Sequence, residues 1–190
     1  MTQWQYFPRS TALPAHLGEL LDAMEHGFSV ISADEMYHES DVVTEILRPH
    51  LESIGYEVEK GKRKNQKVPR PVLFGANGTV DKQFEVDAFH APTGTVVEIE
   101  AGRGVRNHQF LKDFFEACCI QDAEYLVIAV LNEYTPASMT KNPGRDFDEV
   151  VTFFDSLYAS NRLTLPLKGI LIVGYDNTGL SRRAGRSPSS

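Results

Sequence analysis

Two short segments of the chain place an acidic side chain at every second position, and this pattern restricts both their structure and their chemistry. The segments are Phe84-Glu85-Val86-Asp87-Ala88-Phe89 and Thr95-Val96-Val97-Glu98-Ile99-Glu100-Ala101. Side chains alternate between the two faces of a β-strand. Each segment therefore predicts a strand with one apolar face and one carboxylate face.

The connector between these segments predicts how they pair. In Ala91-Pro92-Thr93-Gly94, the proline and the glycine occupy the positions that a type I turn favours. A hairpin folded about this turn sets Asp87 opposite Glu98, and Glu85 opposite Glu100. Like charges directly opposite one another destabilise a sheet, so four acids need a cation or altered protonation. The pattern favours a divalent metal site built for hydrolysis.

The composition predicts one ordinary globular domain with an uneven charge distribution. The chain has 190 residues, of which 42% are hydrophobic, and a net charge of −7. Six of its 19 basic residues nevertheless fall between positions 60 and 70: Lys60, Lys62, Arg63, Lys64, Lys67 and Arg70. A local basic surface is compatible with an acidic total, because distribution matters more than the sum.

The expected location is the cytoplasm. The start of the chain lacks the basic and apolar regions of a signal peptide, and no apolar run is long enough for a membrane helix. Cys118 and Cys119 are neighbours within a helical pattern, so they point in different directions and predict plain thiols rather than a disulfide or zinc site.

Apolar periodicity predicts the order of elements along the chain. Helices are expected over 13–25, from a capping box at Ser32 and Glu35 to about residue 54, over 105–121 and over 146–159. Strands are expected over 56–59, 84–89, 95–101, 125–130 and 167–175, with a loop over 60–70. This order predicts an α/β fold with a mixed sheet flanked by helices in three layers.

The domain organisation follows from the same reading. We expect a single domain over 1–176, with its core at about 33–175 and a helical extension over 1–31. The segment 177–190 is rich in Ser, Arg and Gly and is expected to be a disordered tail.

The acidic pattern and the element order together resemble the PD-(D/E)XK nuclease superfamily, whose members have the restriction-endonuclease-like fold. Its signature is an acid in one strand and acid-x-Lys in the next, on an αβββαβ core. Asp87 matches the first acid and Glu98 the second. Glu100 stands where the family usually has lysine, and this Glu-x-Glu variant resembles the BamHI-type enzymes.

The resemblance implies a divalent-metal-dependent DNA endonuclease of the type II restriction-enzyme kind, acting on double-stranded DNA as a homodimer. It implies Mg²⁺, with Mn²⁺ as an alternative, held by Asp87, Glu98 and the backbone carbonyl at Ile99. Glu100 would order or deprotonate the attacking water. Glu39, on the inward stripe of the preceding helix, is a further candidate ligand. Its alternative role is that of a helix-start acid favoured by the macrodipole.

The resemblance also directs attention to the basic residues. Arg103 is expected at the active site, where it would bind a phosphate oxygen. The expected DNA contacts are Lys62, Arg63, Lys64, Lys67, Arg106, Asn107 and His108. Charge balance for the arginines and a solvated loop at 60–70 remain as alternatives. So do a non-catalytic DNA-binding or interaction module on a degenerate nuclease fold, and a repair, phage or RNA nuclease of the same fold.

Overall fold

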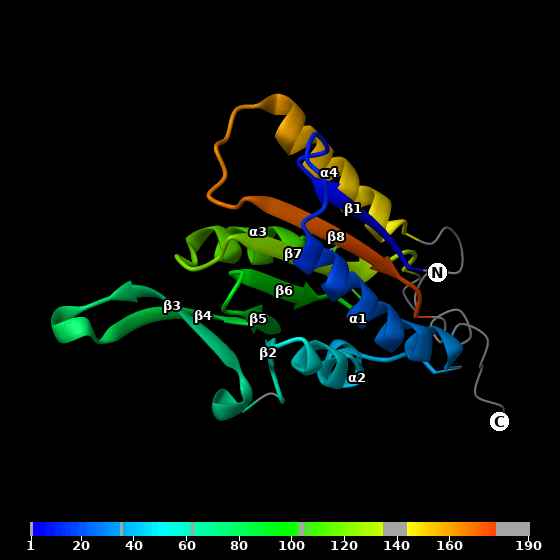
Figure 1. Ribbon diagram of the computed structural model, residues 1–190, viewed down its shortest axis with the longest axis horizontal. Coiled ribbons are helices and arrows are strands. Elements are labelled where there is room, and N and C mark those ends of the chain that lie inside the picture. Colours follow the sequence, from blue (N-terminus) through cyan, green and yellow to red (C-terminus); the bar gives the residue numbers. More distant parts are fainter. Residues whose placement is uncertain are drawn as a thin grey trace, which may run out of the picture.

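A six-stranded mixed β-sheet forms the centre of the molecule, and helices cover both of its faces (Figure 1). The computed structural model describes residues 2–34, 36–61, 63–102, 105, 107–134 and 144–177. Across the sheet the strands lie in the order β1 (Gln3–Phe7), β8 (Gly169–Tyr175), β7 (Tyr125–Leu131), β6 (Thr95–Ile99), β5 (Ala88–His90) and β2 (Glu57–Val58). The helices are α1 (Ala15–Ala33), α2 (Ser40–Ser53), α3 (Gln109–Cys119) and α4 (Asp146–Ser160).

The middle of the sheet is parallel and its edges are antiparallel. Strands β6, β7 and β8 run in parallel, and α3 and α4 connect them in sequence. The outer pairs β1–β8, β5–β6 and β2–β5 are antiparallel. The structure thus confirms the predicted α/β class, with a mixed sheet between two layers of helices.

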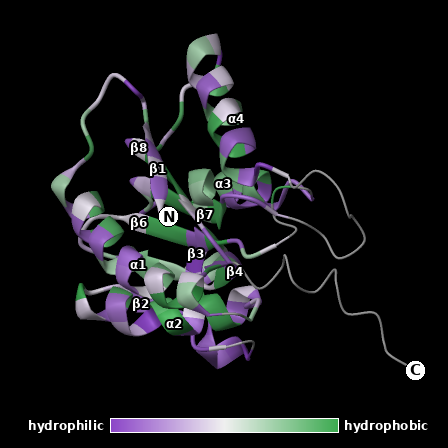
Figure 2. Cartoon of the chain, turned by 90° about the vertical axis from the view of Figure 1, so that its right-hand side faces the viewer, coloured by the Kyte–Doolittle hydropathy of each residue, from purple (hydrophilic) through white to green (hydrophobic). Residues whose placement is uncertain are grey.

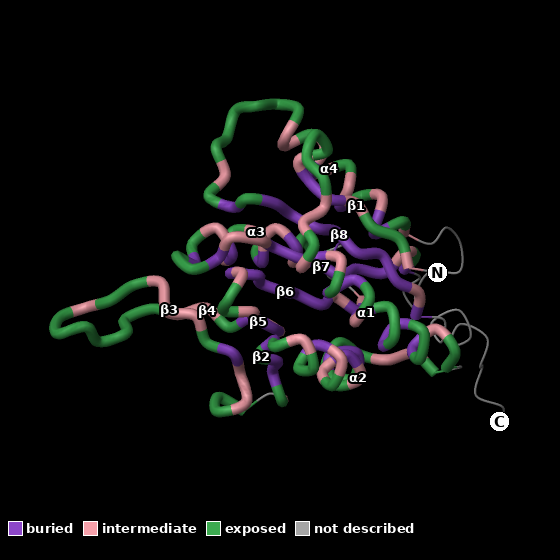
Figure 3. Tube along the Cα trace, viewed as in Figure 1, coloured by how far each residue is buried: buried purple, intermediate pink, exposed green. Residues whose placement is uncertain are grey.

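The strand alternation divides the interior into two hydrophobic clusters, one on each face of the sheet. Val97 and Ile99 of β6 pack in the cluster that α1 and α2 complete, whereas Val96 belongs to the cluster on the α3 and α4 side. Figure 2 shows the hydrophobic colouring concentrated in the sheet, and Figure 3 shows the same strands as buried. Glu98 follows the parity of Val96, so its side chain lies on the α3 side of the sheet.

A second, two-stranded sheet projects from this body as an arm (Figure 1). It consists of β3 (Val68–Phe74) and β4 (Val80–Val86), with the short 3₁₀ turns η1 (Lys64–Gln66) before it and η2 (Ala76–Gly78) at its tip. The loop predicted over 60–70 is therefore wrong at its last three residues, 68–70, where β3 begins.

The strand predicted over 84–89 divides at Asp87. Residues up to Val86 pair with β3, whereas Ala88 onward pairs with β6. The predicted pairing of Glu85 with Glu100 is wrong, because Glu85 lies opposite Pro69 of the arm. The predicted register of the other pair is preserved, since Ala88 lies opposite Val97 and the ladder leads Asp87 toward Glu98.

The N-terminal part differs most from the prediction. Helix α1 runs on to Ala33 because Phe28 and Ile31 continue its buried stripe. The predicted cap Ser32 lies inside this helix and donates its hydroxyl to the carbonyl of Phe28 at 2.8 Å. Strand β1 was not predicted. The disordered tail expected over 177–190 is wrong at its first residue, because Asn177 is buried and donates from Nδ2 to the carbonyl of His38 at 2.8 Å, whereas 178–190 lie outside the described residues. No helix in the described part is long and apolar enough to span a membrane.

Candidate functional site

The residues at the C-terminal end of β6 border a cleft of about 480 Å³. The base of the β3–β4 arm forms one wall, and α3 forms the opposite wall. The side chains and backbone groups that line it are those of Ser40, Glu59, Lys67, Glu85, Asp87, Glu98, Ile99, Glu100, Gln109, Lys112 and Asp113. The three acids of the predicted site, Asp87, Glu98 and Glu100, thus lie in one cleft.

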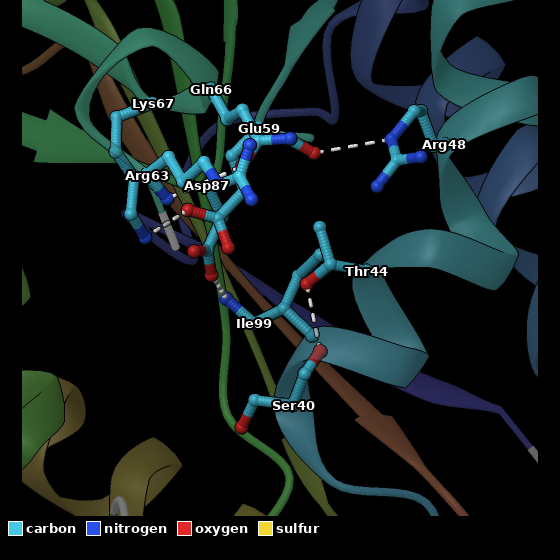
Figure 4. A network of polar contacts seen from close by, with 9 residues as sticks. All are labelled: Ser40, Thr44, Arg48, Glu59, Arg63, Gln66, Lys67, Asp87 and Ile99. Carbon is cyan, nitrogen blue, oxygen red and sulfur yellow. Dashed lines mark hydrogen bonds and ion pairs between the residues drawn. The ribbon is translucent and has the colours of Figure 1, made fainter. Parts of the chain in front are cut away.

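Asp87 occupies the junction at which the chain leaves the arm and enters the central sheet. Its Oδ2 accepts a hydrogen bond from the backbone N–H of Ile99 at 2.7 Å (Figure 4). Its own backbone carbonyl accepts the N–H of Glu59 at 2.8 Å. The Asp87 carboxylate therefore accepts the N–H of β6 that a neighbouring strand would otherwise accept. This bond fixes the carboxylate beside the C-terminal end of β6.

Glu98 and Glu100 extend from the end of β6, and several contacts fix the backbone that follows them. The N–H of Glu100 donates to the carbonyl of Ala129 at 2.8 Å, and its carbonyl accepts the hydroxyl of Tyr175 at 3.0 Å. Ala101 donates its N–H to Ser40 Oγ at 3.3 Å and accepts a bond from the Tyr37 hydroxyl. The strand end is held from both sides, which limits the movement of the two carboxylates.

Helix α3 contributes a polar face that sequence reasoning did not identify. Gln109, Lys112 and Asp113 follow one another at helical spacing, and all three line the cleft. Asp113 is buried, with 5% of its surface exposed, and accepts a hydrogen bond from Gln109 Nε2 at 3.1 Å. Lys112 Nζ lies 3.8 Å from Asp113 Oδ1 and 3.3 Å from Glu116 Oε1.

Burial and mutual repulsion keep the cleft acids protonated to unusually high pH. Burial, reinforced by the charge of Glu59, raises the pKa of Asp87 to about 7. Burial and the neighbouring Asp87 raise the pKa of Glu98 well above its ordinary value. Burial and a shared hydrogen bond with Asp113 raise the pKa of Glu100 to about 8. In the absence of a cation, bringing these groups together favours their neutral forms.

Two lysines flank the acids and do not balance them. Lys67 donates from Nζ to Glu59 Oε2 at 2.5 Å on the arm side (Figure 4), and Lys112 stands on the α3 side. The acids of the cleft are six: Glu59, Glu85, Asp87, Glu98, Glu100 and Asp113. The excess of negative charge makes the cleft a favourable place for a hard cation.

The donor set fits a magnesium-type ion bound partly by water or substrate. Among the described residues, no three histidine, cysteine or acidic side chains converge so as to enclose a metal by themselves. Mg²⁺ is commonly bound through one or two carboxylates, with waters and phosphate oxygens completing its shell. Asp87 and Glu98 supply such a pair. Ile99 points its side chain into the opposite core, so its backbone is what borders the cleft.

The other predicted site residues lie in several places. Glu39 is the exposed N-cap of α2, and its neighbour Ser40 borders the cleft in its stead. Asn107 and His108 are exposed before α3 and do not line the cleft. Arg63 and Lys64 are exposed at η1, beside Lys67, whereas Lys62, Arg103 and Arg106 lie outside the described residues.

One signal in the sequence pointed to the missed face of α3. The buried stripe of this helix is Phe110, Asp113 and Ala117, so an acid interrupts an apolar face. The apolar residue Phe115 lies off this stripe, and its ring is exposed. Charged residues are rarely buried without a partner, so Asp113 on the inward stripe predicted a polar site. Glu59, by contrast, lies at the cleft through its contact with Lys67, and no pattern in the sequence indicates that position.

Comparison with known proteins finds structural matches, among them two structures of restriction endonuclease BglII. No protein-family model matches the sequence, and no curated protein matches it. The chain is similar to the crystal structure of restriction endonuclease BglII complexed with a DNA 16-mer, at 12% identity and a TM-score of 0.48, over 93% of this chain and 76% of that one. It is similar to free BglII at 12% identity and a TM-score of 0.46, over 92% and 79% of the two chains. The assignment of function therefore rests on the residues of the cleft.

Proposed function

We propose that this protein is a divalent-metal-dependent nuclease that hydrolyses phosphodiester bonds of double-stranded DNA. The observation that carries the proposal is that Asp87, Glu98 and Glu100 line one cleft together with two lysines. A cluster of buried acids lowers the stability of the fold, so its presence indicates a function. Carboxyl groups with perturbed pKa values in a cleft are characteristic of catalytic sites.

The roles follow from position. Asp87 and Glu98 hold Mg²⁺ or Mn²⁺, together with the Ile99 carbonyl. When bound, the ion neutralises phosphate charge and lowers the pKa of a coordinated water. The hydrogen bond from the Ile99 N–H to Asp87 orients that carboxylate in advance. Glu100 shares a hydrogen bond with Asp113, and in its deprotonated form, which a bound cation favours, the Glu100 carboxylate would accept the proton of the attacking water.

Lys112 supplies a positive charge that the strand itself lacks. Position 100 carries an acid, whereas Lys112 reaches the same cleft from α3, where its charge opposes part of the rise that burial causes in the pKa values of Glu98 and Glu100. A lysine here favours a phosphate oxygen and counters the repulsion between the acids and the DNA backbone.

DNA contacts outside the cleft fall to the basic surface beside it. Arg63 and Lys64 are exposed next to Lys67, which itself borders the cleft. Two copies related by a two-fold axis would bring one such cleft to each strand of a duplex, so the working form is a homodimer. A repair, phage or RNA-directed nuclease would use the same cleft on a different nucleic acid.

Cleavage of supercoiled plasmid and of a linear duplex in Mg²⁺, with EDTA as the reference, tests the proposal. We expect nicked and linear products in Mg²⁺ only, and no products from Asp87→Asn or Glu98→Gln. Glu149→Gln is the matched control, because it removes one exposed carboxylate on α4 without touching the cleft.

Each outcome has a distinct meaning. Metal-dependent products from the two cleft variants at the rate of the wild type would refute the proposed site. DNA binding without cleavage by the wild type would support a non-catalytic DNA-binding module in its place. Cleavage of RNA but not of DNA would move the substrate to the other nucleic acid.

A further inference from the structure

The β3–β4 arm extends well beyond the residues that line the cleft. Its base is part of the body, where Val68 and Val86 are buried, whereas almost every residue from 73 to 82 is exposed (Figure 3). From Val86, which directly precedes Asp87, the six residue steps of β4 to Val80 at the tip span about 20 Å at about 3.3 Å each. That distance equals about six base-pair steps along a duplex.

The base of the arm is fixed against the sheet. The Arg70 guanidinium lies 3.9 Å from the centre of the Phe89 ring and donates from Nη2 to Glu57 Oε2 at 2.5 Å. These contacts join β3 to β5 and β2. The arm is therefore presented in a set direction, which reduces the entropy cost of binding a partner along it.

The segment that leads into the arm is basic, although the arm itself is neutral and the chain as a whole is acidic. Residues 60–86 contain seven of the chain's 19 lysines and arginines but only two of its 26 acids. The remainder of the molecule is correspondingly acidic. This distribution favours a polyanion beside the arm, since a polyanion would be repelled by most of the remaining surface.

The tip, which lies beyond this basic segment, carries apolar side chains that are largely exposed. Leu73 and Phe74 are each 57% exposed and Val80 is 47% exposed, and Phe74 lies opposite Val80 in the ladder. Nearby, Lys82 Nζ lies 4.9 Å from the centre of the Phe84 ring. Exposed apolar groups gathered in one place mark a contact surface.

The β3 edge of the arm is poorly suited to pairing with another strand. Pro69 and Pro71 lie in β3, and proline has no backbone N–H to donate. Prolines and bulges are devices that protect an edge from pairing, and β3 also has register shifts between Pro71 and Phe74. Strand addition at the β3 edge is thereby disfavoured, whereas the tip side chains and the basic residues are available as contact groups.

We infer that the β3–β4 arm binds double-stranded DNA, and that Leu73, Phe74 and Val80 at its tip enter a groove about six base pairs from the bond at the cleft. The inference rests on the proposed function, since it takes the same duplex as partner. Lysines and arginines contact phosphates, whereas apolar side chains contact sugar and base edges and can wedge between base steps.

The test measures binding of fluorescent duplexes in EDTA, where a metal-dependent enzyme does not cut. The tip variant carries Leu73→Ser and Phe74→Ser. The control variant carries Phe115→Ser and Leu163→Ser, two side chains that are each 64% exposed on other parts of the molecule. Because all four are exposed, we expect all variants to fold, and thermal melting checks this.

We expect the tip variant to bind a duplex of about 24 base pairs roughly tenfold more weakly than the wild type, a loss of about 1.4 kcal/mol. A duplex of about eight base pairs reaches about 14 Å from its centre, short of the tip, so its affinity should not change. The control variant should bind both like the wild type. Apolar contacts release no counterions, so the salt dependence should keep its slope in the tip variant, whereas Lys82→Ala should reduce it by about one.

Other results would overturn the inference. Equal binding of the long duplex by the wild type and the tip variant would remove the tip from the DNA interface. A change from dimer to monomer in the tip variant, measured by light scattering, would make the tip a self-association surface. If the wild type binds the duplexes with the expected length dependence but does not cleave DNA in Mg²⁺, only the nuclease proposal is refuted. If the wild type binds neither duplex, both proposals are refuted.

Discussion

Asp87 links the architecture to the chemistry at the scale of a single residue. It lies where one strand of the arm ends and one strand of the central sheet begins, so its side chain is free to bond the Ile99 N–H. In a continuous hairpin, the Ile99 N–H would instead donate to a backbone carbonyl of the neighbouring strand. Because strand pairing is interrupted at Asp87, its carboxylate is held in a fixed orientation at the cleft.

Neutral amides at Asp87 and Glu98 test the metal-holding role. We expect Asp87→Asn and Glu98→Gln to reduce single-turnover cleavage by about three orders of magnitude or more, because each removes a charged oxygen ligand. Asparagine retains an oxygen that can accept the Ile99 N–H, so the local structure should persist. DNA affinity in EDTA should be unchanged or higher, because neither substitution adds a negative charge beside the phosphates. Weaker DNA binding by both variants would identify the acids as structural.

Glu100 can be tested separately from the metal ligands. We expect Glu100→Gln to lower the single-turnover rate by about 10²–10⁴-fold, the usual contribution of a general acid or base. The magnesium concentration at half-maximal rate should shift much less, because the ion is held by the other two acids. A magnesium titration at saturating DNA measures both quantities. A rate near that of the wild type would exclude Glu100 from water activation.

The sequence predicted the strand acids of the cleft but not the residues opposite them. Alternation within a strand is local information, so Asp87, Glu98 and Glu100 could be placed together from two segments and a turn. Asp113 and Lys112 come from a helix whose rotation depends on packing, and Glu59 and Ser40 come from connections between distant elements. Those positions depend on tertiary contacts that no local pattern encodes.

At the scale of elements, the β5–β6 turn sets the register that brings the acids together. Gly94 has a φ of +62°, and its carbonyl accepts the N–H groups of Glu124 and Tyr125 at 2.7 and 3.1 Å. A Cβ at this position would lie 2.4 Å from the carbonyl oxygen of Asp122. The turn thus requires glycine both for its conformation and for its close approach to the start of β7.

Gly94→Ala should consequently destabilise the protein more than a substitution that adds only conformational strain. Gly78 is the matched control, with a φ of +74° and no atom within 4 Å of its would-be Cβ. We expect Gly78→Ala to cost about 1–2 kcal/mol, or roughly 2–8 °C in melting temperature. Gly94→Ala should cost at least twice as much, measured by thermal melting. Equal shifts for the two variants would mean that the contact with Asp122 relaxes freely.

Element prediction succeeded where periodicity was long and failed where pairing was distant. The buried strands β7 and β8 and the helix α4 were predicted nearly within their bounds, because each shows a clear apolar pattern. Strand β1 is short and pairs with the far end of the chain, so its identity depends on β8. Strand β3 contains two prolines, and only its pairing with β4 stabilises it as a strand.

At the scale of the whole molecule, the cleft opposes folding when no cation is present. Six acids and two lysines share one cleft, and folding raises the pKa values of Asp87, Glu98 and Glu100. In the unfolded chain these groups titrate near pH 4. Between about pH 4 and pH 8, the folded protein therefore binds more protons at these groups than the unfolded chain does, and linkage makes stability fall as pH rises.

The final prediction is that the metal-free protein loses stability as pH rises, and that magnesium restores it. In EDTA, the contribution of Asp87 and Glu100 is fully present below about pH 4 and is lost as pH passes through their folded pKa values of about 7 and 8. The double variant Asp87→Asn, Glu100→Gln lacks these titrations, so its melting temperature should exceed that of the wild type increasingly toward pH 8. Magnesium at about 100 times its dissociation constant should add about 2.7 kcal/mol to the wild type at pH 8. It should add much less to the double variant, which has lost one metal ligand. Melting curves of the wild type and of the double variant from pH 5 to pH 8.5, each with and without magnesium, measure these effects. A wild type that melts higher at pH 8 than at pH 5 in EDTA, relative to the variant, would mean that the acids are stabilised as anions by groups of the protein itself, and the need for a cation would disappear.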